Sequence, residues 1–304
     1  MDGFLNVWKP PGPTSHDVID QIRRLLGLTR VGHAGTLDPM ACGVLVVALG
    51  KATRALEYIR SEPKEYRARM VLGVSTDTQD ASGAVMDEAD ASGVTREMFE
   101  QVLQRFTGEL EQIPPMVSAV KHQGHRLYQL AREGKIVERQ PRQVEVHAIQ
   151  VIEFLPGARA QAEIQVTCSG GTYIRTLCAD IGADLGCGAH MSSLERTRVG
   201  EFRAAGSVML PELADAQRNG NLQDHLVSVS RAVDHLPAAA LSLEDVRRLT
   251  HGLTIHLREG RVGEVVRALS PHGELVAFGV TDLEDGRIVL RPRKVLAELV
   301  EVGP

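Results

Sequence analysis

Several features are missing from this 304-residue sequence, and each absence narrows the interpretation. The longest apolar run, residues 44–49, is too short to span a bilayer. The first residues, MDGFLNVWKPPG, lack the basic and then apolar segments of a signal peptide. There is no Walker loop and no G-x-G-x-x-G motif, so no nucleotide cofactor is indicated. We therefore expect a soluble, cytoplasmic protein without membrane contact.

Cysteine is scarce. Its four copies, Cys42, Cys168, Cys178 and Cys187, form no C-x-x-C pair and no zinc-like spacing with histidine. In a reducing compartment such cysteines are usually small core side chains. We expect no metal and no cofactor.

Charge is unevenly distributed along the chain, although the net charge is only −5. Residues 23–69 carry nine Lys/Arg and four Asp/Glu, and residues 121–142 carry six and two. The intervening residues 70–115 carry nine acids and two bases. Such segregation can build a basic face for a polyanion. Charge alone fits solvated helix faces without a partner equally well.

One loop contains a single carboxylate, Asp38. The apolar spacing predicts a helix over residues 15–26, with Ser15 as N-cap and Gly27 as its stop. GHAGTLDPMACG, residues 32–43, then predicts a loop, because its glycines and proline disfavour regular structure. The loop leads into the apolar strand at 44–49, so Asp38 is expected to be held still by the core.

Two further polar side chains occupy unusual positions. Alternation over residues 65–74 predicts a strand with Tyr66 on its apolar side. A helix is predicted from about residue 172 to 185, with Arg175 in the first turn, where the helix dipole disfavours a cation. A compensating carboxylate or phosphate would explain Arg175. A core tyrosine and an unpartnered surface arginine remain open alternatives.

Five stretches resemble the TruB family of pseudouridine synthases, in the family's order. The first is GHAGTLDPMACGVL, with LNVWKPPGPTSHDV before it and KATRALEYI after it. The others are KEYRARMVLGVSTDTQDASG, IPPMVSAVKHQGHRLYQLAREG, SGGTYIRTLCADIGADLG and LERTRVGEF. Together they cover most of residues 3–235. The STDTQDASG segment resembles the bacterial, stand-alone form that modifies uridine 55 in the T-loop of tRNA.

The resemblance implies an α+β fold with a mixed, largely antiparallel sheet and a small C-terminal β domain. Residues 1–235 would form the catalytic domain, with 121–142 as a basic RNA-binding insert. Residues 236–304 would form a PUA-like RNA-binding domain, where the strand-like pieces become short and turns frequent. The substrate would be tRNA. A monomer would act on it without guide RNA, protein partner, metal or cofactor.

The resemblance also implies roles for single residues. Asp38 matches the catalytic aspartate, Tyr66 the tyrosine that stacks on the base and is implicated in proton transfer, and Arg175 the arginine that pairs with the catalytic carboxylate. The remaining matches serve substrate binding and support: His33 in opening the T-loop, Tyr173 and Leu194 as pocket walls, Lys9 with Pro10 beneath the site, and Asp80 as a polar partner of Arg175.

The implied reaction is an isomerisation of uridine to pseudouridine. The base leaves the sugar, rotates and rejoins it through carbon 5, so no water needs activation and one carboxylate suffices, unlike the pair in glycosidases. Two other functions stay open: an RNA-binding folding factor without activity and a nucleoside hydrolase. An intact set of Asp38, Tyr66 and Arg175 disfavours the first, and the absence of a second carboxylate beside Asp38 disfavours the second.

Overall fold

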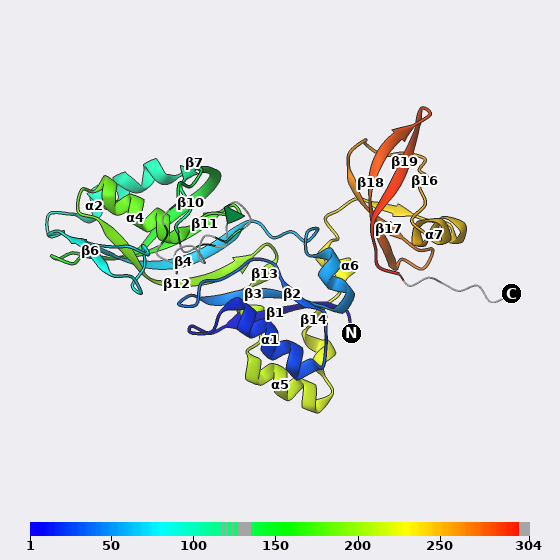
Figure 1. The fold of residues 1–304 in the computed structure, drawn as a ribbon, viewed down its shortest axis with the longest axis horizontal. Helices are drawn as coiled ribbons and strands as arrows, with labels where there is room; N and C mark the ends of the chain where they lie inside the picture. Colours follow the sequence, from blue (N-terminus) through cyan, green and yellow to red (C-terminus); the bar gives the residue numbers. More distant parts are fainter. Residues whose placement is uncertain (117, 119–120, 123–124, 127–134, 136, 298–304) are drawn as a thin grey trace.

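The computed structural model describes residues 1–304 except 117, 119–120, 123–124, 127–134, 136 and 298–304. Within these described residues, two sheets account for most strands, and the smaller one lies at one end of the elongated molecule (Figure 1). No helix of the described part combines the length and the apolar character needed to cross a membrane.

The larger sheet joins ten of the described strands, eight of them in the order β14-β1-β3-β12-β4-β11-β10-β7. The strands are β1 (Gly3–Lys9), β2 (Val31–His33), β3 (Cys42–Leu49), β4 (Lys64–Leu72), β7 (Gly108–Gln112), β10 (Arg142–Leu155), β11 (Gln161–Cys168), β12 (Ala189–Val199), β13 (Phe202–Arg203) and β14 (Leu226–Val227). The pairing of β3 with β12 is parallel, and the other described pairings in this sheet are antiparallel. The expected mixed, largely antiparallel sheet is confirmed.

Helices cover parts of this sheet. They are α1 (Ser15–Leu26), α2 (Arg96–Leu103), α4 (Ile174–Asp184), α5 (Leu210–Asn219) and α6 (Val229–Ala232), with short 3-10 helices η1 (Gly50–Ala55), η2 (Gln104–Phe106), η3 (Ala204–Gly206) and η4 (Leu222–His225). In Figure 1, α2 and α4 lie over the end of the sheet formed by β10 and β11, whereas α1 and α5 lie near β1. The two groups bury separate clusters of apolar side chains.

Helix α1 has the predicted bounds, but its predicted N-cap is wrong. The cap is Thr14, whose hydroxyl accepts from the backbone N–H of Asp17 at 3.1 Å. Ser15 is the first helical residue and is buried, because its hydroxyl bonds the backbone of Leu37 instead. Gly27 ends the helix as predicted, in the left-handed conformation with φ 64°.

The strand predicted at 65–74 runs from Lys64 to Leu72 as β4. Gly73 ends it because its φ of 83° turns the chain away. Residues beyond it form β5 (Val74–Thr76), which pairs with β6 (Val85–Glu88) in a separate ribbon. Tyr66 lies on the apolar side of β4, as predicted, with 7% of its surface exposed.

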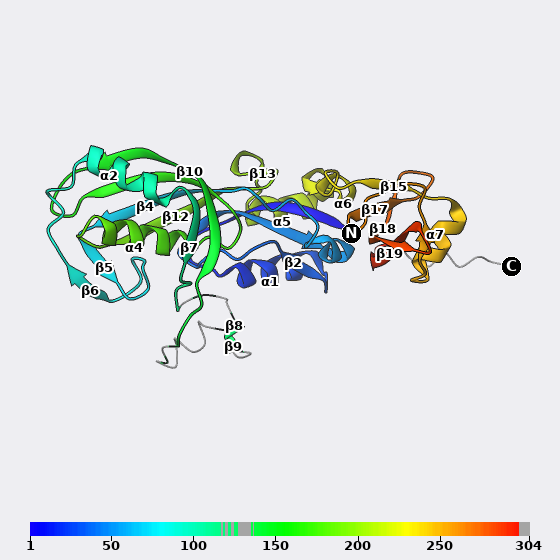
Figure 2. The same cartoon turned by 90° about the horizontal axis from the view of Figure 1, so that it is seen from above.

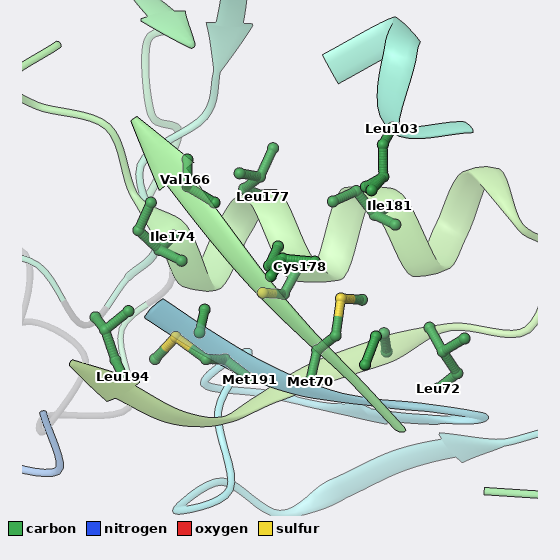
Figure 3. Close-up of a cluster of buried hydrophobic side chains, with 14 of the residues drawn as sticks. Met70, Leu72, Leu103, Val166, Ile174, Leu177, Cys178, Ile181, Met191 and Leu194 are labelled. Atoms are coloured by element: carbon green, nitrogen blue, oxygen red, sulfur yellow. The ribbon is translucent and has the colours of Figure 1, made fainter. Parts of the chain in front are cut away.

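The core beneath α4 determines where that helix begins. Figure 3 shows Cys178 of α4 pointing toward Met70 of β4, and Ile181 of α4 lying beside Leu103 of α2. These side chains belong to one buried cluster with Leu177 of α4 and Met191 of β12. Burying a side chain of this size stabilises the fold by about 1.5–3 kcal/mol. The packing therefore holds α4 against the sheet and fixes the position of its first turn, which contains Arg175.

The smaller sheet has the order β15-β17-β18-β19-β16 and packs against α7 (Leu243–Thr250). Its strands are β15 (Ala238–Ala240), β16 (Ile255–His256), β17 (Val265–Leu269), β18 (Leu275–Glu284) and β19 (Arg287–Val295). The Phe278 ring of this sheet stacks on Tyr58 beside η1, with ring centroids 4.2 Å apart. The C-terminal β domain therefore rests directly on the larger domain.

The expected basic insert, residues 121–142, lies partly outside the described residues. Strands β8 (Lys121–His122) and β9 (His125–Arg126) pair with each other. Figure 2 shows this ribbon set apart from the larger sheet, beyond the end of β7.

Candidate active site

The loop between β2 and β3 carries Asp38, and the side chain of Lys9 binds the backbone of this loop. The Lys9 ammonium is fully buried and donates to the carbonyl oxygens of Pro10 at 2.9 Å, Pro39 at 3.2 Å and Ala41 at 2.6 Å. Burial lowers the pKa of Lys9 to about 8, so the charged form still predominates at neutral pH. Three acceptors satisfy its three donors, and the chain that follows Asp38 is held at Pro39 and Ala41.

Two further side chains hold the same loop by its backbone. The Ser15 hydroxyl accepts from the N–H of Leu37 at 2.8 Å and donates to its carbonyl at 3.1 Å. Arg196, 1% exposed on β12, donates to the carbonyl oxygens of Gly35 at 3.0 Å and Thr36 at 3.3 Å. The residue next to Leu37 is Asp38, so its carboxylate is positioned before any ligand arrives, which lowers the entropic cost of reaction.

Arg175 joins two carboxylates. Its Nε and Nη2 lie 3.0 Å and 3.3 Å from the two oxygens of Asp38, and its Nη1 lies 3.1 Å from Oδ2 of Asp80. The Arg175 side chain is 4% exposed. The two acids compensate for a buried cation in the first turn of α4, where the dipole opposes it.

Asp80 acts as an anchor for Arg175. It is 4% exposed and accepts from the hydroxyls of Thr78 at 2.8 Å and Ser82 at 2.5 Å, and from the Ser82 N–H at 3.0 Å. Burial alone would raise the pKa of Asp80, but these hydrogen bonds and Arg175 outweigh it and lower the pKa. Asp80 therefore stays ionised, and its oxygens are occupied by the protein.

Asp38 has a different environment. Burial raises its pKa above the ordinary value, and the charge of Asp80 adds to this, while Arg175 opposes both. About a third of the side chain, 34%, remains accessible. The carboxylate therefore has one side against Arg175 and another side open to a cavity.

This cavity has a volume of about 280 Å³. Its lining comes from four segments of the larger domain and one residue of the 113–118 region: Gly35, Thr36, Leu37, Asp38, Lys64, Tyr66, Ser118, Gly171, Thr172, Tyr173, Ile174, Arg175, Leu194 and Arg196. Tyr66 and Leu194 are each 7% exposed and come from neighbouring strands. Burial raises the pKa of Tyr66, so its phenol stays neutral. An aromatic and an aliphatic wall beside one carboxylate suit a flat, polar ligand.

The structure places the other sequence-predicted residues around this cavity. Tyr173 lines it at the N-cap of α4. Lys9 and Asp80 do not line the cavity. Lys9 binds the backbone of the Asp38 loop, and Asp80 contacts Arg175. His33 is half-buried on β2, and its Nδ1 has no hydrogen-bond partner among the described residues. Burial lowers the pKa of His33, and His33 is not among the residues that line the cavity.

Sequence reasoning missed three polar side chains that lie here. Gln112, 2% exposed, bonds both the N–H and the carbonyl of Tyr173, at 2.9 Å and 3.3 Å. Arg196 and Lys64 line the cavity itself. Strand periodicity could have found the last two, because Lys64 precedes Tyr66 by two residues and Arg196 follows Leu194 by two, which puts each pair on one face.

The raised pKa of Asp38 makes a testable prediction about pH. If turnover needs the ionised carboxylate, kcat/KM should fall on acidification at a pH above the ordinary aspartate value of about 3.9. Asp80→Asn removes a neighbouring negative charge and should move this fall to lower pH. Turnover measured from pH 3.5 to 8, with circular dichroism to monitor folding, checks both. A profile flat down to the ordinary aspartate value of about 3.9 would contradict the assignment.

Family models match most of the chain. The model described as TruB family pseudouridylate synthase, N-terminal domain, matches residues 23–174. The model described as tRNA pseudouridylate synthase B C-terminal domain matches residues 175–234.

Similar proteins cover nearly the whole chain. The protein named tRNA pseudouridine synthase B of Moorella thermoacetica is 45% identical, over 97% of this chain and 99% of the relative. The protein of the same name from Pelotomaculum thermopropionicum is 42% identical, over 98% of each. Among solved structures, a chain of an H/ACA ribonucleoprotein bound to a substrate RNA containing 2′-deoxyuridine matches with a TM-score of 0.74 and 30% identity. That match covers 98% of this chain and 86% of the other. A chain of a Cbf5-Nop10-Gar1 complex matches with a TM-score of 0.73 and 34% identity, over 98% of this chain and 85% of the other.

Proposed function

Because this chain belongs to the TruB family and isomerises uridine in tRNA to pseudouridine, we propose that its target is uridine 55 of the T-loop. The observation that carries the chemistry is the pairing of Asp38 with Arg175 at a cavity walled by Tyr66 and Leu194. The STDTQDASG segment, which resembles the stand-alone bacterial form, supports the choice of uridine 55.

In this proposal Asp38 acts at carbon 1′ of the target ribose. Its ionised carboxylate stabilises the cationic sugar, or bonds to it, as the bond from carbon 1′ to nitrogen 1 breaks. The uracil then turns between Tyr66 and Leu194, and carbon 5 bonds to carbon 1′. Carbon 5 loses its proton and nitrogen 1 gains one, so the reaction needs no co-reactant.

The surroundings of Asp38 favour isomerisation over hydrolysis. A hydrolase would need a second group to activate water. The nearest second carboxylate, Asp80, has its oxygens bound by Thr78, Ser82 and Arg175. Among the described residues it does not line the cavity, so it is badly placed to activate a water there.

Tyr66 has two proposed roles. Its ring offers a stacking surface, worth about 1–3 kcal/mol for a base. Its hydroxyl, kept neutral by burial, is available to relay the proton that carbon 5 loses. Tyr173 and Leu194 complete the pocket wall, and His33 assists the opening of the T-loop, a step that costs a few kcal/mol.

We propose further that the enzyme acts in the cytoplasm as a monomer, without guide RNA or protein partner. Residues 1–235 would supply the catalytic domain, and the insert at 121–142 would contact tRNA phosphates. Residues 236–304 would act as a PUA-like domain that binds RNA outside the T-loop and adds affinity without chemistry.

Release of tritium tests this function. With a T-loop hairpin carrying 5-tritiated uridine, the enzyme should release the tritium of one uridine per molecule, because only the target carbon 5 loses its hydrogen. A hairpin with cytidine in place of uridine 55 is the matched control and should release none. Equal release from both hairpins would show that uridine 55 is not the target.

A further inference from the structure

Three cations line the cavity in the described part of the chain, and two of them already have acceptors. Arg175 is paired with two carboxylates. Arg196 donates to the carbonyl oxygens of Gly35 and Thr36 and to that of Val44 at 2.8 Å. Lys64 differs: within the described residues its ammonium makes no hydrogen bond and no ion pair. An ammonium that faces the cavity and has no acceptor in the described part of the chain is available to a ligand.

The position of Lys64 follows from strand geometry. It is the first residue of β4 and shares the inward face with Tyr66, two residues on. A Cβ atom added to Gly35 or Gly170 would lie 3.6 Å or 3.5 Å from the Lys64 nitrogen, so the ammonium sits between those two glycines. Glu62, the nearest acid, bonds the Gly170 N–H at 2.7 Å instead.

Lys64 is half-buried, and the exposure of its neighbours puts this position at the rim of the cavity. Neighbouring lining residues Thr36 and Gly171 are exposed. A nucleotide with carbon 1′ at Asp38 and its base between Tyr66 and Leu194 keeps its phosphates nearer the rim, where they stay partly hydrated.

We propose that Lys64 binds a backbone phosphate of the target nucleotide at the mouth of the cavity and thereby contributes affinity for RNA. The inference deepens the proposed function and rests on it. Phosphate is the group on RNA that carries full negative charge, and a lysine ammonium binds it as a point charge. The phosphate charge does not change during isomerisation, so the contact strengthens substrate and transition-state binding alike.

Lys64→Met tests this assignment. The RNA concentration that gives half the saturating single-turnover rate should rise about tenfold to a hundredfold, with the saturating rate within threefold of the parent. The salt dependence of binding should become shallower by about 0.7 in log–log slope, as expected for one phosphate on a single strand. Lys64→Arg, which keeps the charge, should recover most of the affinity.

Arg67→Met is the matched control. Arg67 lies on the opposite face of β4 and contacts Glu163 at 3.3 Å, so its loss should leave RNA binding unchanged. Removing a partly buried cation that has no ion-pair partner among the residues the structure describes should not unfold the protein, and thermal melting of both variants checks this. Lys64→Gln provides a second variant should Lys64→Met melt early.

Two modified hairpins identify the contacted group. Each carries one uncharged methylphosphonate, on the 5′ or the 3′ side of the target uridine. On the hairpin whose methylphosphonate replaces the contacted phosphate, Lys64→Met should bind as tightly as the parent, because the negative charge that Lys64 contacts is already absent. On the other hairpin, Lys64→Met should bind more weakly than the parent. An equal loss on both modified hairpins, a loss below threefold, or a loss confined to the saturating rate would overturn the assignment. If Lys64→Met still turns over normally at saturating RNA, each of these results would reject the role of Lys64 without rejecting the proposed action on uridine 55.

Discussion

Asp38→Asn should lower the single-turnover rate by about 10⁴-fold or more, with little change in fold or RNA affinity. Asparagine has the same shape but neither stabilises a cationic sugar nor bonds to it. The fold should persist because Arg175 keeps Asp80 at 3.1 Å and the Thr78 carbonyl at 3.2 Å. The loop backbone also stays bound by Lys9, Ser15 and Arg196.

The measurement is the rate at saturating T-loop hairpin, together with the melting temperature and the dissociation constant for RNA. Asp180→Asn makes the same chemical change on the exposed side of α4 and should turn over like the parent. If the saturating rate of Asp38→Asn lies within tenfold of the parent rate, Asp38 does not take part in the reaction. A melting temperature far below that of the parent would instead give the carboxylate a structural role.

Arg175→Met should lower both stability and turnover. Methionine leaves two carboxylates facing each other without their shared cation, and breaking a buried pair in this way costs about 3–5 kcal/mol. The pKa of Asp38, already raised by burial, should rise further when the opposing charge of Arg175 is lost. Urea denaturation and single-turnover rates between pH 6 and 8 measure the two effects.

The double variant Arg175→Met, Asp80→Asn separates these effects. With Asp80 neutralised, much of the lost stability should return, because no buried carboxylate is left without its cation and the repulsion from Asp38 is gone. Turnover should stay low, because Asp38 still lacks the arginine that orients it. A double variant that regains turnover would reduce Arg175 to a structural counterion for Asp80. If Arg175→Met lowers the free energy of unfolding by less than about 1 kcal/mol, the expected cost of breaking this buried ion pair is wrong.

Local patterns in the sequence were sufficient for the elements closest to the site. Gly27 and the apolar spacing before it gave the bounds of α1, and alternation around Tyr66 gave the inward face of β4. The misplaced charge of Arg175 pointed to a compensating carboxylate or phosphate, and the structure shows two carboxylates beside it. These predictions rest on interactions within one segment, which a sequence displays directly.

Contacts between segments could not be derived in the same way. Ser15 is a good N-cap residue, yet it bonds Leu37, because folding brings the start of α1 against a loop 22 residues away. Arg196 and Gln112 are polar residues in strands, and nothing adjacent in sequence shows that they bond Gly35 and Tyr173. Such side chains take their roles from the pairing of distant strands, which periodicity does not specify.

The side chains that hold the Asp38 loop bind its backbone and do not contact its carboxylate. Lys9, Ser15 and Arg196 bind the main chain of the loop, at the carbonyls of Gly35, Thr36, Pro39 and Ala41 and at both backbone groups of Leu37, but not the Asp38 carboxylate. The position of the Asp38 loop is thus determined by residues outside the segment that contains it. For protein engineering, this makes the Thr36 side chain, which lines the cavity and is exposed, open to redesign for new substrates, while the three distant supports keep the loop backbone in place.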